Sequence, residues 1–367
     1  MGSCVIAVDA RYGLQSPRRG IGEYVFQLMR RLADMPRSYD LWLYGDRSAD
    51  PSVVREFQAA YTVEILPAPN FFWWEQRVFP LAVRRHQLVH ATANIAPLLS
   101  SVPVVMTVHD VIEWRRGHLF GGKIPWRHHV SRLYRMNALK RAAPRAQLIF
   151  TVSRHAASDI ETVLGVPRDR IVVTPLAPKY SSGELTWPKD PYVLALGAQD
   201  PRKNTAGMLE AARELTALGI GVKIVGVEAR RLQEFQAPEI RNLEVVGMIS
   251  DDRLEELYRR AGCFVYPSLY EGFGLPVLEA MALGCPVVTG RNSSLPEVAG
   301  TAAALADTLD PHAIAQAVQN IMGDPVRQRE MAEQGLAWAG TFDWQTTADL
   351  THQSYEQVLR HLGHGAV

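Results

Sequence analysis

The sequence predicts an α/β chain of two doubly wound domains, each a parallel sheet with helices on both faces. Short apolar runs alternate with longer segments of helical periodicity along the whole chain. This alternation starts again after a proline-bearing stretch at 174–188, and a length of 367 residues suits two domains of ordinary size. Repeated β–α alternation is typical of parallel sheets, whose strands are buried on both faces.

In the first half we expect seven strands and two clear helices. A helix at 22–33 has Val25, Leu28, Met29 and Leu32 at helical spacing, and Ser153 is placed to cap a second helix at 153–164. The expected strands are 4–8, 41–44, 63–66, 88–90, 104–108, 148–152 and 171–174.

In the second half we expect five strands and three helices. The segment 174–188 holds three prolines and no periodicity, which indicates a linker, so the expected domains are 1–177 and 178–341. Ligands of doubly wound sheets bind at the carboxyl ends of the strands. The expected strands are 192–196, 222–225, 243–246, 263–266 and 286–289, with helices at 205–218, 252–261 and 275–283.

Composition excludes several classes of protein. Hydrophobic residues make up 47% and charged residues 21%, as in ordinary globular domains, and no apolar stretch is long enough to span a bilayer. The three cysteines have no metal-ligand spacing, and a reduced cytoplasmic location is expected. Residues 1–177 hold 23 Lys and Arg and 14 Asp and Glu, a net +9, whereas residues 178–367 hold 16 and 24, a net −8. The basic half favours an anionic membrane or a phosphorylated acceptor, or is simply an uneven solvated surface.

The most informative motif is the segment 267–288. It runs from a strand through Glu271-Gly-Phe-Gly-Leu-Pro into a helix, and a further strand follows. Two glycines let backbone N–H groups approach a phosphate, and the helix start favours an anion. Glu271 lies in the mouth of the loop. Glu279 lies a turn into the helix, where its carboxylate could accept bonds from ribose hydroxyls.

Two glutamates eight residues apart around Gly-Phe-Gly-Leu-Pro resemble the signature of the family 4 retaining glycosyltransferases, which have the GT-B fold of two Rossmann-like domains facing across a cleft. The resemblance implies that Glu271 contacts the donor sugar and diphosphate and that Glu279 binds the ribose. It also implies a terminal helix at 342–367 that crosses back to the first domain. The implied donor-binding residues are Gly20, Gly22, Ile249, Gly272, Phe273, Gly274, Leu275 and Glu279.

A second motif, Pro201-Arg202-Lys203-Asn204, ends a loop at a helix start. Two cations and the amides there could hold a diphosphate and stabilise charge on the leaving nucleotide without a metal. The motif resembles the family's Pro-Arg-Lys-Asn element. Many members also carry an Arg directly after the strand glycine, where this chain has Ala198, so Arg202 is expected to compensate.

A third motif ends the strand 104–108 with His109-Asp110. By resemblance His109 lies beside the anomeric carbon of the donor as a positioning and electrostatic group. The expected catalytic residues are therefore His109, Glu271, Arg202 and Lys203. The glycines of Arg19-Gly20-Ile-Gly22 match the family's glycine loop, although a lone Gly-x-Gly is equally typical of ordinary loops.

These motifs predict a metal-independent glycosyltransferase that needs no cofactor. It would move a hexosyl group, mannosyl from GDP-mannose by preference, from a nucleotide sugar to a glycan or lipid-linked acceptor in polysaccharide biosynthesis. No nucleic acid partner is expected. A nucleotide-sugar epimerase of the same architecture and a non-catalytic nucleotide-sugar-binding protein are the alternatives.

Two segments carry weaker expectations. Asn70-Phe-Phe-Trp-Trp-Glu-Gln resembles family members that use GDP-mannose, and its aromatic cluster at 71–74 is interpreted as core packing. A basic helical stretch at 127–145 is either a peripheral docking face for the anionic inner membrane or a solvated flank. Its cations are Arg127, Arg132, Arg135, Lys140, Arg141 and Arg145.

Overall fold

A computed structural model describes residues 4–119, 126–180, 183–230 and 240–364. The chain divides into two compact units. Unit 1 comprises Met1–Trp114, Lys123–Leu176 and Asp343–Val367, and unit 2 comprises Arg115–Gly122 and Ala177–Phe342. Unit 1 is therefore assembled from separate stretches of chain, and the segment that begins at Arg115 departs from the continuous first domain expected at 1–177.

Unit 1 contains a parallel sheet of seven strands in the order β3-β2-β1-β4-β5-β6-β7. All seven expected strands form, with bounds that differ by one to three residues. The strands are β1 Cys4–Asp9, β2 Tyr39–Gly45, β3 Thr62–Ile65, β4 Leu88–Ala91, β5 Val104–Thr107, β6 Leu148–Thr151 and β7 Ile171–Val173.

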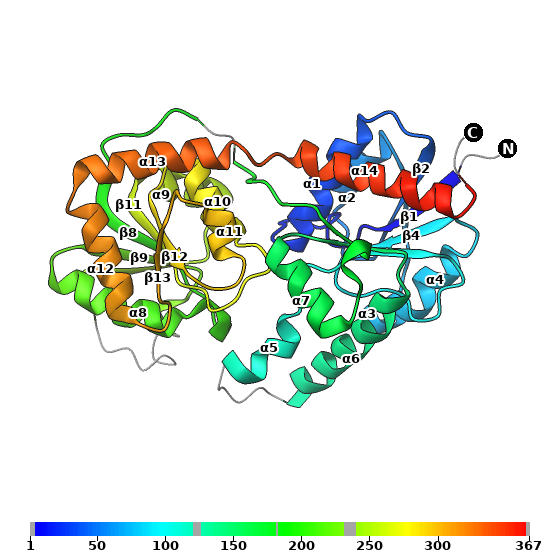
Figure 1. The fold of residues 1–367 in the computed structure, drawn as a ribbon, viewed down its shortest axis with the longest axis horizontal. Coiled ribbons are helices and arrows are strands. Elements are labelled where there is room, and N and C mark those ends of the chain that lie inside the picture. The colour runs from blue at the N-terminus through cyan, green and yellow to red at the C-terminus, as the bar shows by residue number, and fades with distance from the viewer. Residues whose placement is uncertain (1–3, 120–125, 181–182, 231–239, 365–367) are drawn as a thin grey trace. The chain divides into compact units, whose positions relative to one another are not determined.

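Helices surround this sheet in Figure 1. Ser153 Oγ accepts from the Ala156 N–H at 3.0 Å, which confirms the expected cap. Helix α1 buries the apolar stripe expected from the sequence. The helices of unit 1 are α1 Ile21–Ala33, α2 Pro51–Gln58, α3 Phe71–Trp73, the π-helical turn η1 Trp74–Val78, α4 Phe79–Ala82, α6 Trp126–Ala142, α7 Arg154–Leu164 and α14 Trp344–His361, with 3-10 turns η2 Ala143–Arg145 and η3 Arg168–Arg170. Helix α5 Ile112–Leu119 begins in unit 1 and continues into the segment assigned to unit 2.

Unit 2 contains a parallel sheet of six strands in the order β10-β9-β8-β11-β12-β13. The expected five form, and the short β13 was not anticipated because its three residues carry no periodic signal. The strands are β8 Asp190–Leu196, β9 Gly221–Val225, β10 Leu243–Gly247, β11 Ala261–Tyr266, β12 Val287–Gly290 and β13 Ala304–Ala306.

The three expected helices of unit 2 also form, and the described residues of this unit add α11, α12 and α13 and a 3-10 turn that the sequence did not reveal (Figure 1). The apolar faces of α8 and α12 pack with strands β8, β9, β11 and β12 into one buried core. The helical elements are η4 Pro201–Lys203, α8 Thr205–Ala217, α9 Asp251–Arg260, α10 Leu275–Ala282, α11 Leu295–Ala299, α12 Pro311–Met322 and α13 Pro325–Ala339.

Each sheet has one position where the strand order reverses. In unit 1 the order turns at β1, between β2 and β4, and in unit 2 it turns at β8, between β9 and β11. Ligands of open parallel sheets bind outside the carboxyl ends of the strands at such a switch point. Topology alone therefore directs attention to the loops after β1 and β4 in unit 1 and after β8 and β11 in unit 2.

Candidate functional site

A buried ionic cluster occupies the switch point of unit 2. Glu271, in the loop between β11 and α10, is 7% exposed. Its Oε1 lies 2.7 Å from Lys203 Nζ, and its Oε2 lies 3.7 Å from Arg202 Nη1. The hydroxyls of Tyr266 and Ser268 also donate to Oε1, at 2.8 and 2.7 Å. Arg202, Lys203 and Glu271, which are distant in sequence, thus meet at the carboxyl ends of β8 and β11.

The cations determine the charge state of Glu271. Burial by itself would raise its pKa, but the charges of Lys203 and Arg202, with hydrogen bonds from Lys203 and Ser268, lower the pKa to about 2. The carboxylate is therefore ionised at neutral pH. A base this weak is suited to binding and orienting groups rather than to taking a proton.

The loop that carries the two cations is held by its own backbone chemistry. Asp200 Oδ1 accepts from the Arg202 N–H at 3.1 Å, and Asn204 adopts a left-handed conformation with φ 52°. The Arg202 carbonyl accepts from the Leu269 N–H at 2.7 Å, so the loops after β8 and β11 are joined directly. The carbonyl of Ala198 accepts a hydrogen bond from the Thr205 hydroxyl at 2.8 Å.

The glycine loop before α10 requires a glycine at its end. Gly274 has φ 105°, and a Cβ there would lie 2.8 Å from Leu295 Cδ2. The Ser294 hydroxyl donates to the carbonyls of Glu271 and Phe273 at 2.9 and 2.7 Å, which ties the loop to the residue that precedes α11. Gly272, Phe273 and the helix start at Leu275 lie in this same loop.

The remaining residues expected in unit 2 lie at other places. Glu279 is buried on α10, where burial and then its charge raise the pKa values of Tyr180 and Tyr258. Ile249 lies half-buried after β10, and β9 separates β10 from β8 in the sheet.

A second cluster, at the carboxyl ends of β4 and β5 in unit 1, is neutral. His109 is 7% exposed, and its Nε2 lies 2.9 Å from the Thr92 carbonyl. A carbonyl only accepts, so Nε2 carries the proton and Nδ1 is the acceptor of the neutral ring. Burial lowers the pKa of His109 to about 4, which keeps the ring neutral at physiological pH. His109 can therefore accept a bond from a hydroxyl but supplies no positive charge.

The glycine loop after β1 leads into α1. Gly20 has φ 53°, and a Cβ on Gly22 would lie 2.7 Å from the Tyr12 carbonyl oxygen. A side chain at Gly22 would therefore collide with rigid backbone, so close packing explains this glycine.

A buried charge network beside this loop escaped the sequence analysis. Arg11 donates to both carboxylate oxygens of Asp9, at 3.0 and 2.8 Å, and to Glu75 Oε1 at 3.1 Å. The Tyr134 hydroxyl donates to Glu75 Oε2 at 3.0 Å. The Thr92 hydroxyl donates to the Asp9 carbonyl at 2.6 Å, which joins this network to the residue that holds His109. The position of Asp9 at the end of a strand was the one feature of the sequence that could have indicated this network.

The aromatic cluster at 71–74 is only in part core, which corrects the interpretation above. Trp74 is 1% exposed and stacks on Phe79 with centroids 4.6 Å apart. Phe71, Phe72 and Trp73 are 45–48% exposed. The π-helical turn that starts at Trp74 changes the direction of successive side chains, so four adjacent aromatics face two environments.

Comparison with known proteins identifies the family. A model described as Glycosyltransferase Family 4 matches residues 18–177, and one described as Glycosyl transferases group 1 matches residues 180–338. The chain belongs to the glycosyltransferases. It is 21% identical to sucrose-phosphate synthase of Thermosynechococcus elongatus, with a TM-score of 0.75 over 98% of this chain and 100% of that one, and this likeness shows the GT-B fold.

The curated relatives of this glycosyltransferase include bacterial mannosyltransferases. It is 36% identical to the O-antigen chain mannosyltransferase B of Escherichia coli over 61% of its own length and 64% of that protein. It is 31% identical to the serotype-specific mannosyltransferase WbdA of Escherichia coli over 59% of its own length. The chain thus spans less than two thirds of the length of these relatives, 64% of the first and 29% of the second.

The basic stretch of this glycosyltransferase is less available than its sequence indicates. Arg135 Nη2 lies 2.8 Å from Glu113 Oε1, and Arg132 lies 3.5 Å from Glu113 Oε2 and also donates to its carbonyl. Lys140 and Arg141 on α6 are exposed, as is Arg145 beyond its end. The side chain of Arg127 lies outside the described residues. Among the described helices, none is both long and apolar enough to cross a membrane.

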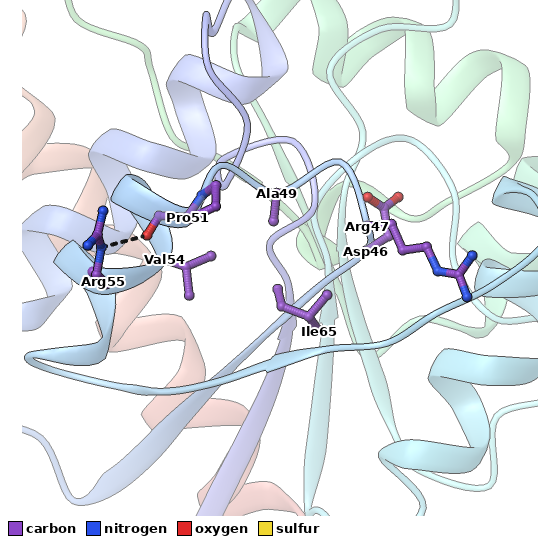
Figure 2. Close-up of a pocket in the computed structure, with 7 residues that line it drawn as sticks. All are labelled: Asp46, Arg47, Ala49, Pro51, Val54, Arg55 and Ile65. Atoms are coloured by element: carbon purple, nitrogen blue, oxygen red, sulfur yellow. Dashed lines mark hydrogen bonds between the residues drawn. The ribbon is translucent and has the colours of Figure 1, made fainter.

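A surface pocket of about 450 Å³ opens in unit 1, on the carboxyl side of β2 and β3. Figure 2 shows Arg55 and Arg47 on opposite sides of Val54 and Ile65. None of the residues expected from the sequence lines it. In the part of the chain that the structure describes, no group of three or more His, Cys, Asp or Glu side chains could hold a metal ion.

Proposed function

We propose that this glycosyltransferase moves a mannosyl group from GDP-mannose to a glycan or lipid-linked acceptor, with retention of anomeric configuration and without a metal. The observation that carries the proposal is the Lys203–Glu271–Arg202 cluster at the switch point of unit 2. The preference for mannose rests on the names of the curated relatives.

In this proposal unit 2 binds the nucleotide end of the donor. Lys203 and Arg202 hold the diphosphate together with the loop from Gly272 to Leu275, and Glu271 keeps both cations in place. Positive charge that is already oriented stabilises the leaving diphosphate at no cost of reorganisation. Arg202 supplies the positive charge that many family members obtain from an arginine at the position of Ala198. Glu279 accepts hydrogen bonds from the ribose hydroxyls.

Unit 1 contributes the neutral groups. Nδ1 of His109 accepts from a sugar hydroxyl, and the Gly20–Gly22 loop contacts the donor phosphate or the acceptor. The bond from the anomeric carbon to the diphosphate oxygen breaks while a bond to the acceptor oxygen forms on the same face. The acceptor proton passes to the departing phosphate oxygen. Glu271 Oε1 already accepts hydrogen bonds from Lys203, Tyr266 and Ser268, which favours an orienting role for this carboxylate over a nucleophilic one.

The first test is a thermal-shift panel of GDP, UDP and dTDP with and without EDTA. We expect stabilisation by GDP that EDTA leaves unchanged and that Lys203→Ala and Glu279→Ala weaken. Lys223→Ala is the matched control, because Lys223 in the same unit pairs with Glu244 on the surface. Stabilisation by UDP alone would contradict the donor, and none by any nucleotide would contradict the assignment of unit 2.

The second test follows the sugar. With GDP-mannose and a mannoside acceptor, NMR of the product is expected to show a new α-mannosidic bond and one GDP released for each bond. A β-linkage would contradict retention. An isomerised sugar without an acceptor would indicate the epimerase, and tight binding without turnover would indicate a binding protein.

We also propose peripheral contact with the anionic cytoplasmic membrane face through Lys140, Arg141 and Arg145, which are the exposed described cations of the basic stretch. Reversing the charges of Lys140 and Arg141 should release the protein from liposomes that contain phosphatidylglycerol. Arg31→Glu, an exposed change on α1, is the control. Unchanged liposome binding by the double variant would reject the contact.

A further inference from the structure

The ring of His109 is held from two directions. Its Nε2–H donates to the Thr92 carbonyl, and its ring meets that of Tyr24 edge to face, with centroids 4.9 Å apart and planes at 84°. The His109 backbone N–H donates to Asn94 Oδ1 at 2.6 Å, which fixes the main chain but not the ring. The direction in which Nδ1 points therefore depends on Thr92 and Tyr24.

Tyr24 is itself fixed by its hydroxyl. It lies on α1 with no exposed surface, and its hydroxyl lies 3.1 Å from Thr107 Oγ1 and also bonds Thr174. Burial raises its pKa to about 12, so the hydroxyl stays protonated and can donate. The ring that supports His109 is thus anchored at its far end.

The anchor continues to the C-terminal helix. Thr107 Oγ1 lies 2.8 Å from His90 Nε2, and His90 Nδ1 bonds the hydroxyl of Tyr355 on α14. Burial lowers the pKa of His90 to about 3, and a proton on the neighbouring His109 would oppose its protonation further. A neutral imidazole has one donor and one acceptor, so the chain from Tyr355 to Tyr24 can satisfy each member. All four side chains are fully buried, and a satisfied buried network specifies one arrangement.

Tyr24 also touches the places where the chain leaves and re-enters unit 1. Thr174 lies two residues before the boundary at Leu176, and Trp344 follows the boundary at Asp343. The rings of Tyr24 and Trp344 lie 6.5 Å apart, and the Thr347 hydroxyl on α14 donates to the Pro175 carbonyl. Helices α1 and α14 lie side by side (Figure 1).

We infer that Tyr24 is a positioning residue for His109, and that the Thr107–His90–Tyr355 chain holds Tyr24 in place from helix α14. The inference rests on the proposed function, in which His109 accepts a bond from the donor sugar. Tyr24 itself touches no substrate. Its contribution is the direction of the His109 ring, so its removal should affect the chemical step rather than nucleotide binding.

Three variants separate the contributions. Tyr24→Leu removes the ring edge, Tyr24→Phe keeps the ring but removes its anchor, and Tyr355→Phe removes the far end of the chain. Tyr44→Phe is the matched control, because Tyr44 is equally buried in unit 1 and its hydroxyl bonds His86 at 2.7 Å. We expect Tyr24→Leu to lower kcat for mannosyl transfer about tenfold or more. Tyr24→Phe should recover most of that loss, and the GDP thermal shift should be unchanged in every variant.

A spectroscopic readout tests the inference without catalysis. The imidazole ¹⁵N signals of His109, assigned by their loss in His109→Gln, should shift in Tyr24→Leu and, by less, in Tyr24→Phe and Tyr355→Phe. They should not shift in Tyr44→Phe. If Tyr24→Leu does not fold, the two phenylalanine variants decide.

The outcomes separate this inference from the proposed function. Unchanged His109 signals in Tyr24→Phe and Tyr355→Phe, together with an unchanged kcat, would overturn the positioning role. If the variants shift the His109 signals but the wild-type protein transfers no sugar, the positioning of His109 is upheld and the proposed function is rejected instead.

Discussion

The ionic cluster of unit 2 and the His109 cluster of unit 1 both lie at the carboxyl ends of neighbouring parallel strands, at β8 and β11 and at β4 and β5, but they differ in electrostatic character. In unit 2 a carboxylate with a pKa of about 2 lies between two cations, whereas in unit 1 a histidine with a pKa of about 4 is bonded to a neutral carbonyl. Parallel sheets of the same kind thus carry a charged cluster in unit 2 and a neutral one around His109 in unit 1, and under the proposed function the first binds a diphosphate and the second sugar hydroxyls. The difference in charge between the clusters comes from the side chains of a few loop residues, because the two sheets determine only where these loops lie.

Removing a cation should have the largest effect and is the most direct way to break this comparison. Lys203→Ala leaves Glu271 buried with one distant cation, so we expect kcat/KM to fall about 100- to 1000-fold and the free energy of unfolding of unit 2 to fall by about 2–3 kcal/mol. His109→Gln should lower kcat/KM by about 10- to 100-fold. Steady-state kinetics checks both, and equal losses would contradict the distinction between the sites.

Acid should destabilise unit 1 before unit 2. His109 and His90 have folded pKa values of about 4 and 3, below the ordinary 6.5, so the unfolded chain binds protons first and stability falls as pH drops below about 6.5. Glu271 stabilises the fold above its ordinary pKa of 4.5, and this stability is lost as pH falls toward 2. Each histidine should account for a few kcal/mol, at about 1.4 kcal/mol per pKa unit.

Hydrogen exchange at pH 7, 5 and 4 would follow the two units separately. Protection is expected to fall first in β4 and β5, and later in β8 and β11. The reverse order would mean that the buried histidines are not the groups that respond to acid.

Two glycines of unit 1 separate the cost of close packing from the cost of backbone conformation. Gly22→Ala places a Cβ 2.7 Å from the Tyr12 carbonyl oxygen and should cost about 1–3 kcal/mol in the free energy of unfolding. Gly165→Ala meets nothing within 4 Å and carries only the strain of φ 68°, which is worth about 1 kcal/mol. Chemical denaturation measures both, and an equal cost would show that close packing does not set the requirement at Gly22.

Removing one neutral hydrogen-bond donor or acceptor at each site tests the same comparison without a change of charge. Ser268→Ala takes a donor from an ionised carboxylate and should cost about 1.5–3 kcal/mol, because bonds to charged groups are the stronger ones. Asn94→Ala takes the acceptor of the His109 backbone N–H and should cost about 1 kcal/mol. Thermal unfolding of both variants tests whether charge, rather than burial, separates the sites.

The sequence predicted those features that are local or periodic. Alternating apolar runs located all seven strands of unit 1, and the spacing of Glu271 and Glu279 pointed to the loop before α10. It missed β13, which has three residues, and did not separate the exposed Phe71–Trp73 from the buried Trp74, because a π-helical turn intervenes. It also missed Arg11, Tyr24, His90 and Tyr355. Their partners are as many as 265 residues away, and only the fold brings them together.

The membership of α14 in unit 1 has a consequence for biosynthesis. The residues of unit 2 from Ala177 to Phe342 leave the ribosome before α14 does, whereas His90 has no Tyr355 to bond until that helix appears. Unit 2 can therefore reach its native state during translation, while unit 1 is completed only afterwards. A chain that stalls before α14 would carry a finished unit 2 beside a unit 1 in which the buried imidazole of His90 still lacks the Tyr355 hydroxyl, so the folding of unit 1 depends on the synthesis of α14.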